Sequence, residues 1–426
     1  MSNFREVSEQ LLSGKISIHE HHPFRPSGEF EEIAEGIAVF NWLANFSAVK
    51  TADGIVMVDA GMTMDRTDAA TMLRRYSPAR VSSVIYTQGA VDHVAGMNAL
   101  AAESAKTRAA RPRVVGHRAT ADRFDRYRRT GSYSRAAYRR TFGQLNAQWP
   151  AEFVYPDTYF DHQFNLTAGN HRFECHHARG AGDDQCWIYL PQGKVLFAGD
   201  FFIWAAPAAG NPAGPTGYAR EWAEALRVMA NCGAEVMVPG HGLPIFGAIR
   251  IRQVLSETAD FLQSIYDQTL TMLNDGAPLE LALAEVKPPT MLADRPYLRA
   301  LYDEPDYIVR NIYRAEGGWY DGMPAHLKPA MAAAQGREVT ELAGGVSRMV
   351  ARAMSHLNGG DLALASHLID WAYAAAPDDP AVNHARMQIY GARAEQSLAL
   401  ITRGIFRAAA HESASKLGLS LANWKD

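Results

Sequence analysis

Cysteine is scarce in this chain, and long apolar runs are missing. The three cysteines, Cys175, Cys186 and Cys232, show no CxxC spacing, so a disulfide framework is not expected. No apolar run approaches the roughly 20 residues that a membrane span needs, and the first residues lack the apolar stretch of a secretory signal. We therefore expect a cytoplasmic protein with no membrane-embedded part.

An excess of positive charge is also missing. The formal net charge is -4, which gives no reason to expect nucleic acid as a partner. One local exception is the Arg/Tyr-rich segment 123–140, "RFDRYRRTGSYSRAAYRR". Such runs usually form the exposed face of a helix. The alternative is a lid whose guanidinium groups bind an anionic substrate.

The order of patterns along the chain predicts two kinds of domain. Residues 35–61 alternate apolar and small polar residues around the turn "TADG", which predicts adjacent strands joined by a tight hairpin. Short apolar runs then alternate with helical stretches up to about residue 255, which is typical of an α/β domain. We expect a catalytic domain over 1–255, a helical linker with the turn "GGWYDGMPAHLKP" over 256–330, and a helical domain over 331–426.

The last part of the chain contains one pattern that resembles a tetratricopeptide-like helical hairpin. Leu364, Leu368 and Trp371 fall on one helical face, and residues 377–380 break the helix before the next one begins. A single repeat cannot bury its own apolar face. We therefore expect it to pack on the main domain, on a second subunit, or on both.

Three predicted strands end in residues that can bind metal. Asp92 and His93 follow the strand in "SVIYTQGAVDHVAG", Asp200 follows the strand in "LFAGDFF", and His241 follows the one in "VMVPGHG". Polar side chains at strand ends are typical of the sites of α/β proteins. Two carboxylates and two imidazoles suit one divalent first-row metal ion, with Asp92 and Asp200 as the candidate catalytic carboxylates.

These motifs resemble those of a known family. The order of Asp59-Ala60-Gly61, Thr87–His93, Gly199-Asp200 and Gly240-His241-Gly242 resembles the metallo-β-lactamase fold superfamily. The strings "DFFIWAAPAAGNP", "REWAEALRVM" and "GGWYDGMPAHLKP" are similar to its alkylsulfatase-like (type III sulfatase) branch. The resemblance implies a four-layer αβ/βα sandwich, a metal site along one edge of its two sheets, and a C-terminal all-α dimerisation domain that makes a homodimer.

The same resemblance implies a metal site that has lost half of its ligands. Asp92, His93 and His241 match the ligands of one ion, and Asp200 matches the residue that bridges two ions. The positions of the other ion's own ligands, and of a further acidic residue, are taken here by Gln88, Ala90, Ala181 and Gln185. We therefore expect the first ion's site to be degenerate and the protein to bind a single ion.

Other histidines offer little replacement for the lost ligands. His176 and His177 are adjacent in a predicted strand, so they point to opposite faces and at most one could reach the site. The segment "HEHHP", residues 19–23, is more typical of a polar N-terminal stretch than of a ligand cluster. Zinc is the metal that the family implies, and the donor set suits Fe(II) or Mn(II) as well.

One metal ion is enough for some hydrolytic chemistry, because it can lower the pKa of a bound water to about 7. Four protein ligands would nevertheless fill a tetrahedral zinc ion. Losing the other ion also removes positive charge where a sulfate oxygen would lie, which disfavours ordinary alkyl sulfate hydrolysis. The expected lining of the substrate pocket is Gln88, Gln185, Trp204, Tyr218 and Arg220.

Three functional hypotheses follow. The first is a mononuclear metal-dependent enzyme, most simply a hydrolase of an ester or related bond in a small organic molecule, with a lyase as a variant of it. The second is a pseudoenzyme that serves as a dimeric binding or scaffold protein. The third is a dinuclear sulfatase in which a residue such as His177 replaces a lost ligand.

Overall fold

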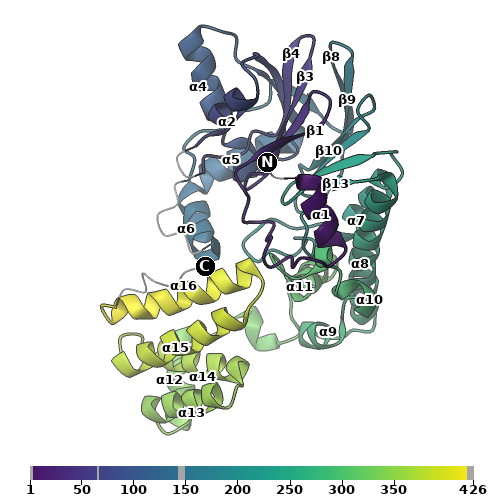
Figure 1. The fold of residues 1–426 in the computed structure, drawn as a ribbon. Coiled ribbons are helices and arrows are strands. Elements are labelled where there is room, and N and C mark those ends of the chain that lie inside the picture. Colours follow the sequence, from purple (N-terminus) through teal and green to yellow (C-terminus); the bar gives the residue numbers. More distant parts are fainter. Residues whose placement is uncertain (1–2, 65–66, 143–148, 420–426) are drawn as a thin grey trace. The chain divides into compact units, whose positions relative to one another are not determined.

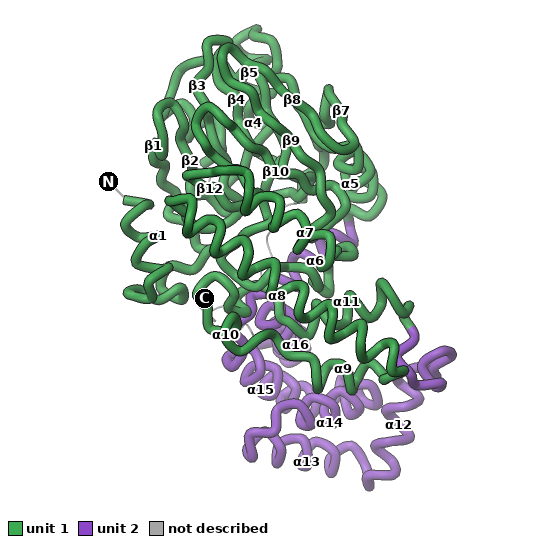
Figure 2. Tube along the Cα trace, turned by 90° about the vertical axis from the view of Figure 1, so that its right-hand side faces the viewer, with its two compact units in different colours: residues 1–131, 149–319 green, residues 132–148, 320–426 purple. Residues whose placement is uncertain are grey.

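The computed structural model describes residues 3–64, 67–142 and 149–419. Its chain forms two compact units, 1–131 with 149–319 and 132–148 with 320–426 (Figure 2). The domain boundaries expected at residues 255 and 330 stay predictions. The two compact units differ from the expected domains in two ways. The residues after 255 continue the first unit as far as 319, and a segment of the Arg/Tyr-rich region belongs to the same unit as the C-terminal helices.

Seven strands form the first sheet in chain order. Its first four strands are antiparallel neighbours, and the rest continue the sheet as parallel strands. The predicted hairpin is present, since Thr51 pairs with Gly54 across the tight turn. The strands are β1 (Phe30–Ala34), β2 (Ile37–Phe40), β3 (Phe46–Thr51), β4 (Gly54–Val58), β5 (Val81–Ile85), β6 (Arg113–His117) and β7 (Thr158–Phe160).

Six strands form the second sheet, in the order β13-β12-β11-β10-β9-β8. All neighbouring pairs are antiparallel except β11 and β12, which run in parallel. The strands are β8 (Gln163–Ala168), β9 (His171–His177), β10 (Cys186–Leu190), β11 (Val195–Gly199), β12 (Val236–Pro239) and β13 (Ile245–Phe246).

The two sheets pack face to face, because one buried apolar cluster takes residues from both, for example Val58 and Ile85 with Phe197 and Val238. Helices cover the outer face of each sheet (Figure 1). The first sheet is covered by α2 (Ala69–Tyr76), α4 (Met97–Thr107) and α5 (Arg118–Arg129), with the short α3 (Val91–Val94) at its edge. This confirms the four-layer αβ/βα sandwich.

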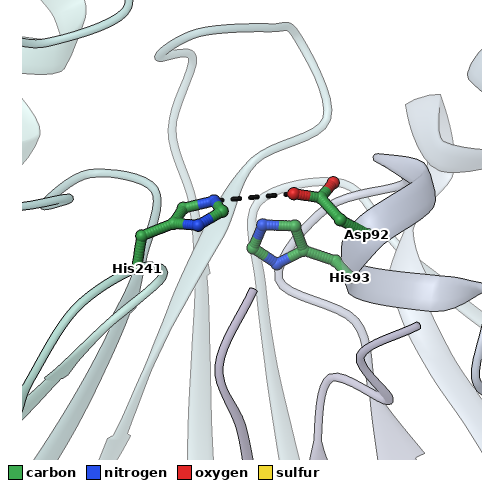
Figure 3. Close-up of side chains that lie close together, drawn as sticks. All are labelled: Asp92, His93 and His241. Atoms are coloured by element: carbon green, nitrogen blue, oxygen red, sulfur yellow. Dashed lines mark ion pairs between the residues drawn. The ribbon is translucent and has the colours of Figure 1, made fainter. Parts of the chain in front are cut away.

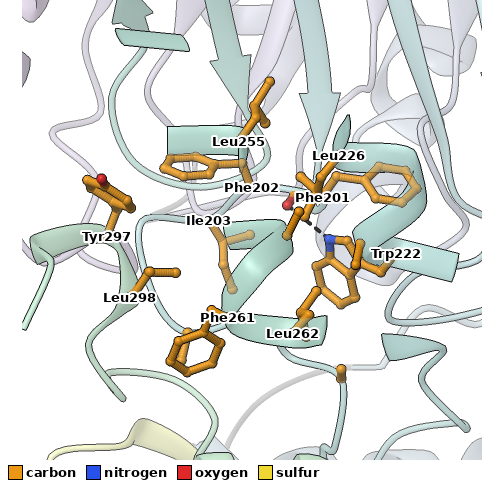
Figure 4. Packing of buried hydrophobic residues seen from close by; sticks show 14 of the residues in the cluster. Phe201, Phe202, Ile203, Trp222, Leu226, Leu255, Phe261, Leu262, Tyr297 and Leu298 are labelled. Atoms are coloured by element: carbon orange, nitrogen blue, oxygen red, sulfur yellow. Dashed lines mark hydrogen bonds between the residues drawn. The ribbon is translucent and has the colours of Figure 1, made fainter. Parts of the chain in front are cut away.

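The outer face of the second sheet carries the larger apolar core (Figure 4). Trp222 is fully buried there, and its Nε1 donates to the carbonyl of Phe201 at 3.1 Å. Within the described part of the chain, no helix is both long and apolar enough to cross a membrane. The remaining helices of this unit are α1 (Phe4–Leu12), α7 (Ala219–Met229), α8 (Ala248–Asn274), α9 (Leu279–Glu285), α10 (Thr290–Ala293), η1 (Pro296–Leu298) and α11 (Pro305–Gly317).

The second unit is helical, and it contains the predicted helical hairpin. Pro380 occupies the first turn of the second helix of that hairpin, and the Asp379 side chain accepts from the backbone N–H groups of residues 381 and 382. Gly404 is required for close packing, because a Cβ there would lie 1.6 Å from the carbonyl oxygen of Thr141. The helices are α6 (Gly131–Phe142), η2 (Pro324–Leu327), α12 (Ala332–Leu342), α13 (Val346–Asn358), α14 (Leu362–Ala375), α15 (Pro380–Gln396) and α16 (Leu400–Lys416).

Candidate metal centre

The predicted metal ligands lie at the carboxyl ends of the parallel strands. Asp92 and His93 are on α3, which begins a few residues after β5 ends. Asp200 follows β11 directly, and His241 follows β12 by two residues. Because parallel strands end at the same edge of a sheet, side chains from the two sheets converge here, as Figure 3 shows for Asp92, His93 and His241.

The distances among these side chains are those of a small metal site. One ligand atom each from Asp92, His93 and His241 lies within 4.8 Å of the others. Asp200 Oδ1 is 3.3 Å from His93 Nε2 and 3.5 Å from His241 Nε2, and the latter atom is 3.6 Å from an oxygen of Asp92. Ligand atoms bonded at about 2.0–2.1 Å to a tetrahedral ion lie about 3.3 Å apart. The structure thus brings Asp92, His93 and His241 together as one candidate ligand group, and an oxygen of Asp200 lies close to the two imidazoles.

Asp59 orients one of the imidazoles. Its Oδ2 accepts from His93 Nδ1 at 2.8 Å and from the Thr87 hydroxyl at 2.6 Å, and its Oδ1 accepts from the Thr87 backbone N–H. When the His93 ring is neutral, as a metal ligand must be, its proton is therefore on Nδ1 and the lone pair of Nε2 faces the centre. Asp59 itself has a left-handed backbone, with φ of 58°, a conformation that Asp adopts more easily than most residues.

The charges of the cluster couple strongly. Burial opposes a charge on His93, but Asp200 and Asp59 outweigh this effect and raise its pKa well above the ordinary value. Burial likewise raises the pKa of Asp200, yet His93 and His241 outweigh it and hold that pKa well below its usual range. The carboxylate therefore favours a positive charge beside it, which a proton or a divalent cation can provide.

The residues present fit one divalent cation. Asp200 Oδ1 is buried, and the Nε2 atoms of the His93 and His241 imidazoles lie 3.3 and 3.5 Å from it. Both nitrogens can bind a metal ion, so a cation placed here would contact this carboxylate and the two rings together. Two imidazole nitrogens and two carboxylates are donors suited to zinc, Fe(II) or Mn(II). The ion would be held by His93, His241, Asp92 and Asp200.

A second ion has no comparable ligand set among residues 3–64, 67–142 and 149–419. Gln88 turns its Nε2 to Asp200 Oδ2 at 2.6 Å and lies 3.1 Å from His93 Nε2. Ala90 and Ala181 carry no donor atom, and the backbone N–H of Ala181 donates to Gln185 Oε1 at 2.8 Å. Gln88 Nε2 thus lies against Asp200 Oδ2, where a further cation would contact Asp200.

His176 and His177, the possible replacements for the lost metal ligands, lie outside the cluster. His177 stacks on His117 with ring centroids 3.6 Å apart, and its Nε2 donates to the carbonyl of Asp183. His176 stacks on Trp187 at 4.0 Å. Burial lowers the pKa of both His176 and His177, so each is a neutral ring engaged in packing.

The segment 19–23 comes closer to the centre than its polar sequence suggests. His22 is buried, and its Nδ1 accepts from the backbone N–H of Phe24. The Phe24 ring in turn packs on His241 at 4.5 Å and stacks on Tyr302 at 4.4 Å. An aromatic surface therefore lies against the imidazole of His241.

The residues expected to line the substrate pocket have different environments. Trp204 is buried, and its Nε1 donates to the carbonyl of Leu243 at 2.7 Å. Tyr218 donates its backbone N–H to Gly180, in the same loop as Gln185. Arg220 pairs with a glutamate on the exposed face of α7. A substrate-binding role for these residues stays a prediction.

Sequence reasoning missed two buried charged residues beside Gln88. The Arg/Tyr-rich segment was expected to form an exposed face, which is wrong for Arg123, because this residue is only 5% exposed. Its Nη1 donates to Gln88 Oε1 at 3.0 Å, and its Nη2 lies 3.2 Å from Asp184 Oδ1. The pair of aspartates in "AGDDQ" was the one available signal.

Comparison with known families matches two stretches of the chain. Residues 41–241 match the metallo-beta-lactamase superfamily, and residues 279–416 match the alkyl sulfatase dimerisation family. Similar proteins include the linear primary-alkylsulfatase of Pseudomonas sp. (strain ATCC 19151), 25% identical over 78% of this chain and 66% of the relative. The (R)-specific secondary-alkylsulfatase of Pseudomonas sp is 30% identical over 50% of this chain and 33% of the relative.

A solved structure shows the same fold. The stereoselective inverting sec-alkylsulfatase Pisa1 from Pseudomonas sp. superimposes with a TM-score of 0.83 at 20% identity, over 92% of this chain and 66% of that protein. The chain thus matches at most 66% of the length of these three relatives.

Proposed function

We propose that the chain, which belongs to the metallo-β-lactamase superfamily and continues into an alkyl sulfatase dimerisation region, is a metal-dependent hydrolase of a small anionic ester. Alkyl sulfates are the first class of substrate to test. The observation that carries the proposal is the convergence of Asp92, His93 and His241, with Asp200 beside the two imidazoles and His93 oriented by Asp59. Both the named relatives and the solved relative are alkylsulfatases.

A divalent ion held by these four residues with a fifth coordination position open would supply a Lewis acid and a water of lowered pKa. The chain's own groups prepare the place for it. Asp59 keeps the proton of His93 on Nδ1, so that Nε2 faces the centre. Gln88 donates to one oxygen of Asp200 and leaves the other, Oδ1, turned toward His93 and His241.

The surroundings of the centre suit an alkyl group. Phe24 and Tyr302 provide stacked rings beside His241, and apolar walls with a few polar groups are typical of small-molecule sites. The carboxylates of Asp92 and Asp200 border the same point and are the groups that accept the proton of an attacking water in this proposal.

The test uses the full chain stripped of metal and then given one equivalent of zinc, Mn(II) or Fe(II). We expect one ion to bind per chain and inorganic sulfate to be released from a linear primary or a secondary alkyl sulfate only after metal is added. Sulfate is measured by ion chromatography, and metal by elemental analysis. A chain that binds far less than one ion would support a binding protein instead, and a loaded chain that releases no sulfate would favour a non-hydrolytic reaction.

A homodimer is part of the same proposal. Leu364 and Trp371 lie two turns apart on α14 and remain 48% and 39% exposed within their unit, and this region matches the dimerisation family. We expect light scattering to give twice the chain mass of 46.8 kDa. Replacing Leu364 and Trp371 together by glutamate should yield monomers, because an apolar interface does not tolerate buried unpaired charge.

The control for the dimer is Val228→Glu, which changes an exposed apolar side chain of the first unit. It should leave the mass unchanged. A dimer that persists when Leu364 and Trp371 are both glutamate would place the interface elsewhere.

A further inference from the structure

Arg123 brings a permanent positive charge to the interior of the first unit. It lies on α5 and is almost fully buried. A buried guanidinium is costly unless it is paired, and Asp184 lies at salt-bridge distance from Nη2. A solvated helix face would have no need of such a partner, so this arginine has a specific place in the structure.

The loop after β9 is shaped to receive the guanidinium. Asp184 is itself fully buried, and its Oδ2 accepts from the backbone N–H of Gly89 at 2.7 Å. A Cβ at Gly182 would come within 2.3 Å of Arg123 Nη2, so a side chain at this position would force the guanidinium to shift. An anchored acid and a matching space together hold the cation in one position.

The guanidinium acts on the centre through the amide of Gln88. Oε1 of this amide accepts from Arg123, while Nε2 of the same amide donates to Asp200. Only the oxygen of an amide can accept from arginine, and only its nitrogen can donate to a carboxylate. Arg123 therefore fixes which way Gln88 faces, and its positive charge polarises the N–H that meets Asp200.

The local charges give a reason for this arrangement. Four carboxylates lie near the strand ends. Those of Asp59 and Asp184 are buried, and the side chains of Asp92 and Asp200 are 28% and 19% exposed. A single divalent ion would balance two of these four negative charges. Uncompensated buried charge is strongly unfavourable. Arg123 provides a permanent positive charge next to Gln88. The sequence alone predicted a loss of positive charge there, because the ligands of the other metal ion are missing.

We propose that Arg123 is a positioning residue that serves as a built-in cation in place of a second metal ion, locking Gln88 onto Asp200 and restricting the centre to one ion. This inference rests on the proposed function, since it assumes that one ion binds at His93, His241, Asp92 and Asp200. The inference itself concerns the positions of the missing ion's ligands, Gln88 and Ala90.

The deciding experiment counts metal ions. One variant, Gln88→His with Ala90→His, returns two imidazoles to the motif, and a second adds Arg123→Met to that pair. With zinc in excess followed by dialysis, we expect one ion per chain while Arg123 is present and two when it is replaced. Equal numbers of ions in the two variants would overturn the inference. Adding Arg128→Met instead, on the exposed face of the same helix, is the control and should leave one ion.

A separate substitution, at Gly182, keeps every charge and moves only the guanidinium of Arg123. Gly182→Ala should displace Arg123, leave one ion bound, and lower kcat by about tenfold, in the lower range seen when outer-shell groups of metal sites are changed. Gly131→Ala adds a methyl group where nothing lies within 4 Å and should change nothing. An unchanged kcat in Gly182→Ala with one ion bound would also overturn the inference. Failure of the proposed function looks different, because the unaltered chain would then bind no ion or release no product.

Discussion

Replacing His241 by alanine is expected to lower the affinity for the metal ion by more than about 100-fold and to remove hydrolysis. Substituting groups that only support a ligand typically costs about 10–100-fold in metal affinity, so loss of a ligand should cost more. His241 Nε2 lies near both Asp92 and Asp200, which would repel each other without the ion. The measurement is a competition titration against a fluorescent chelator, paired with a sulfate release assay.

The matched control is His176→Ala. This histidine also belongs to the first unit and is half-buried, but it stacks on Trp187 and lies outside the cluster. Its loss should leave both the metal affinity and the rate of sulfate release within about twofold of the starting protein. Full activity in His241→Ala would show that the cluster at the strand ends is not the metal site.

Much of the framework could be predicted from sequence because it depends on local patterns. The alternation of residues 35–61 and the "TADG" turn determined the hairpin of β3 and β4. The Asp and His residues that follow strands converge because strand ends converge, so Asp92, His93 and His241 form the cluster and Asp200 lies beside its two imidazoles. The four-layer packing itself came from the resemblance to a family.

Other features could not be predicted because they depend on partners that are distant in the sequence. Most of the Arg/Tyr-rich segment is at least partly exposed, as a charge run suggests, but Arg123 is buried by a loop that follows β9. In the polar stretch 19–23, His22 and Pro23 are buried, and Phe24, the next residue, packs on His241. Local composition averages over a helix face or a loop, whereas burial of one side chain is decided by tertiary contacts.

The second large effect expected is on stability. Asp184→Ala should lower the free energy of unfolding by about 3–5 kcal/mol, which is the usual cost of breaking a buried ion pair by removing one partner. The change leaves the guanidinium of Arg123 without its carboxylate and the backbone N–H of Gly89 without its acceptor. Urea unfolding followed by the fluorescence of the buried Trp204 and Trp222 reports on this unit.

The double variant Arg123→Met with Asp184→Asn separates charge from shape. It removes both charges, keeps an oxygen that can accept from Gly89, and preserves most of the volume, so it should recover more than half of the stability lost in Asp184→Ala. Asp260→Ala breaks the exposed pair with Arg227 and should cost less than about 1 kcal/mol. If Asp184→Ala is no more damaging than Asp260→Ala, the carboxylate does not compensate a buried charge. A double variant that is stable yet alters the number of bound ions would instead show that the pair is retained for the metal centre and not for stability.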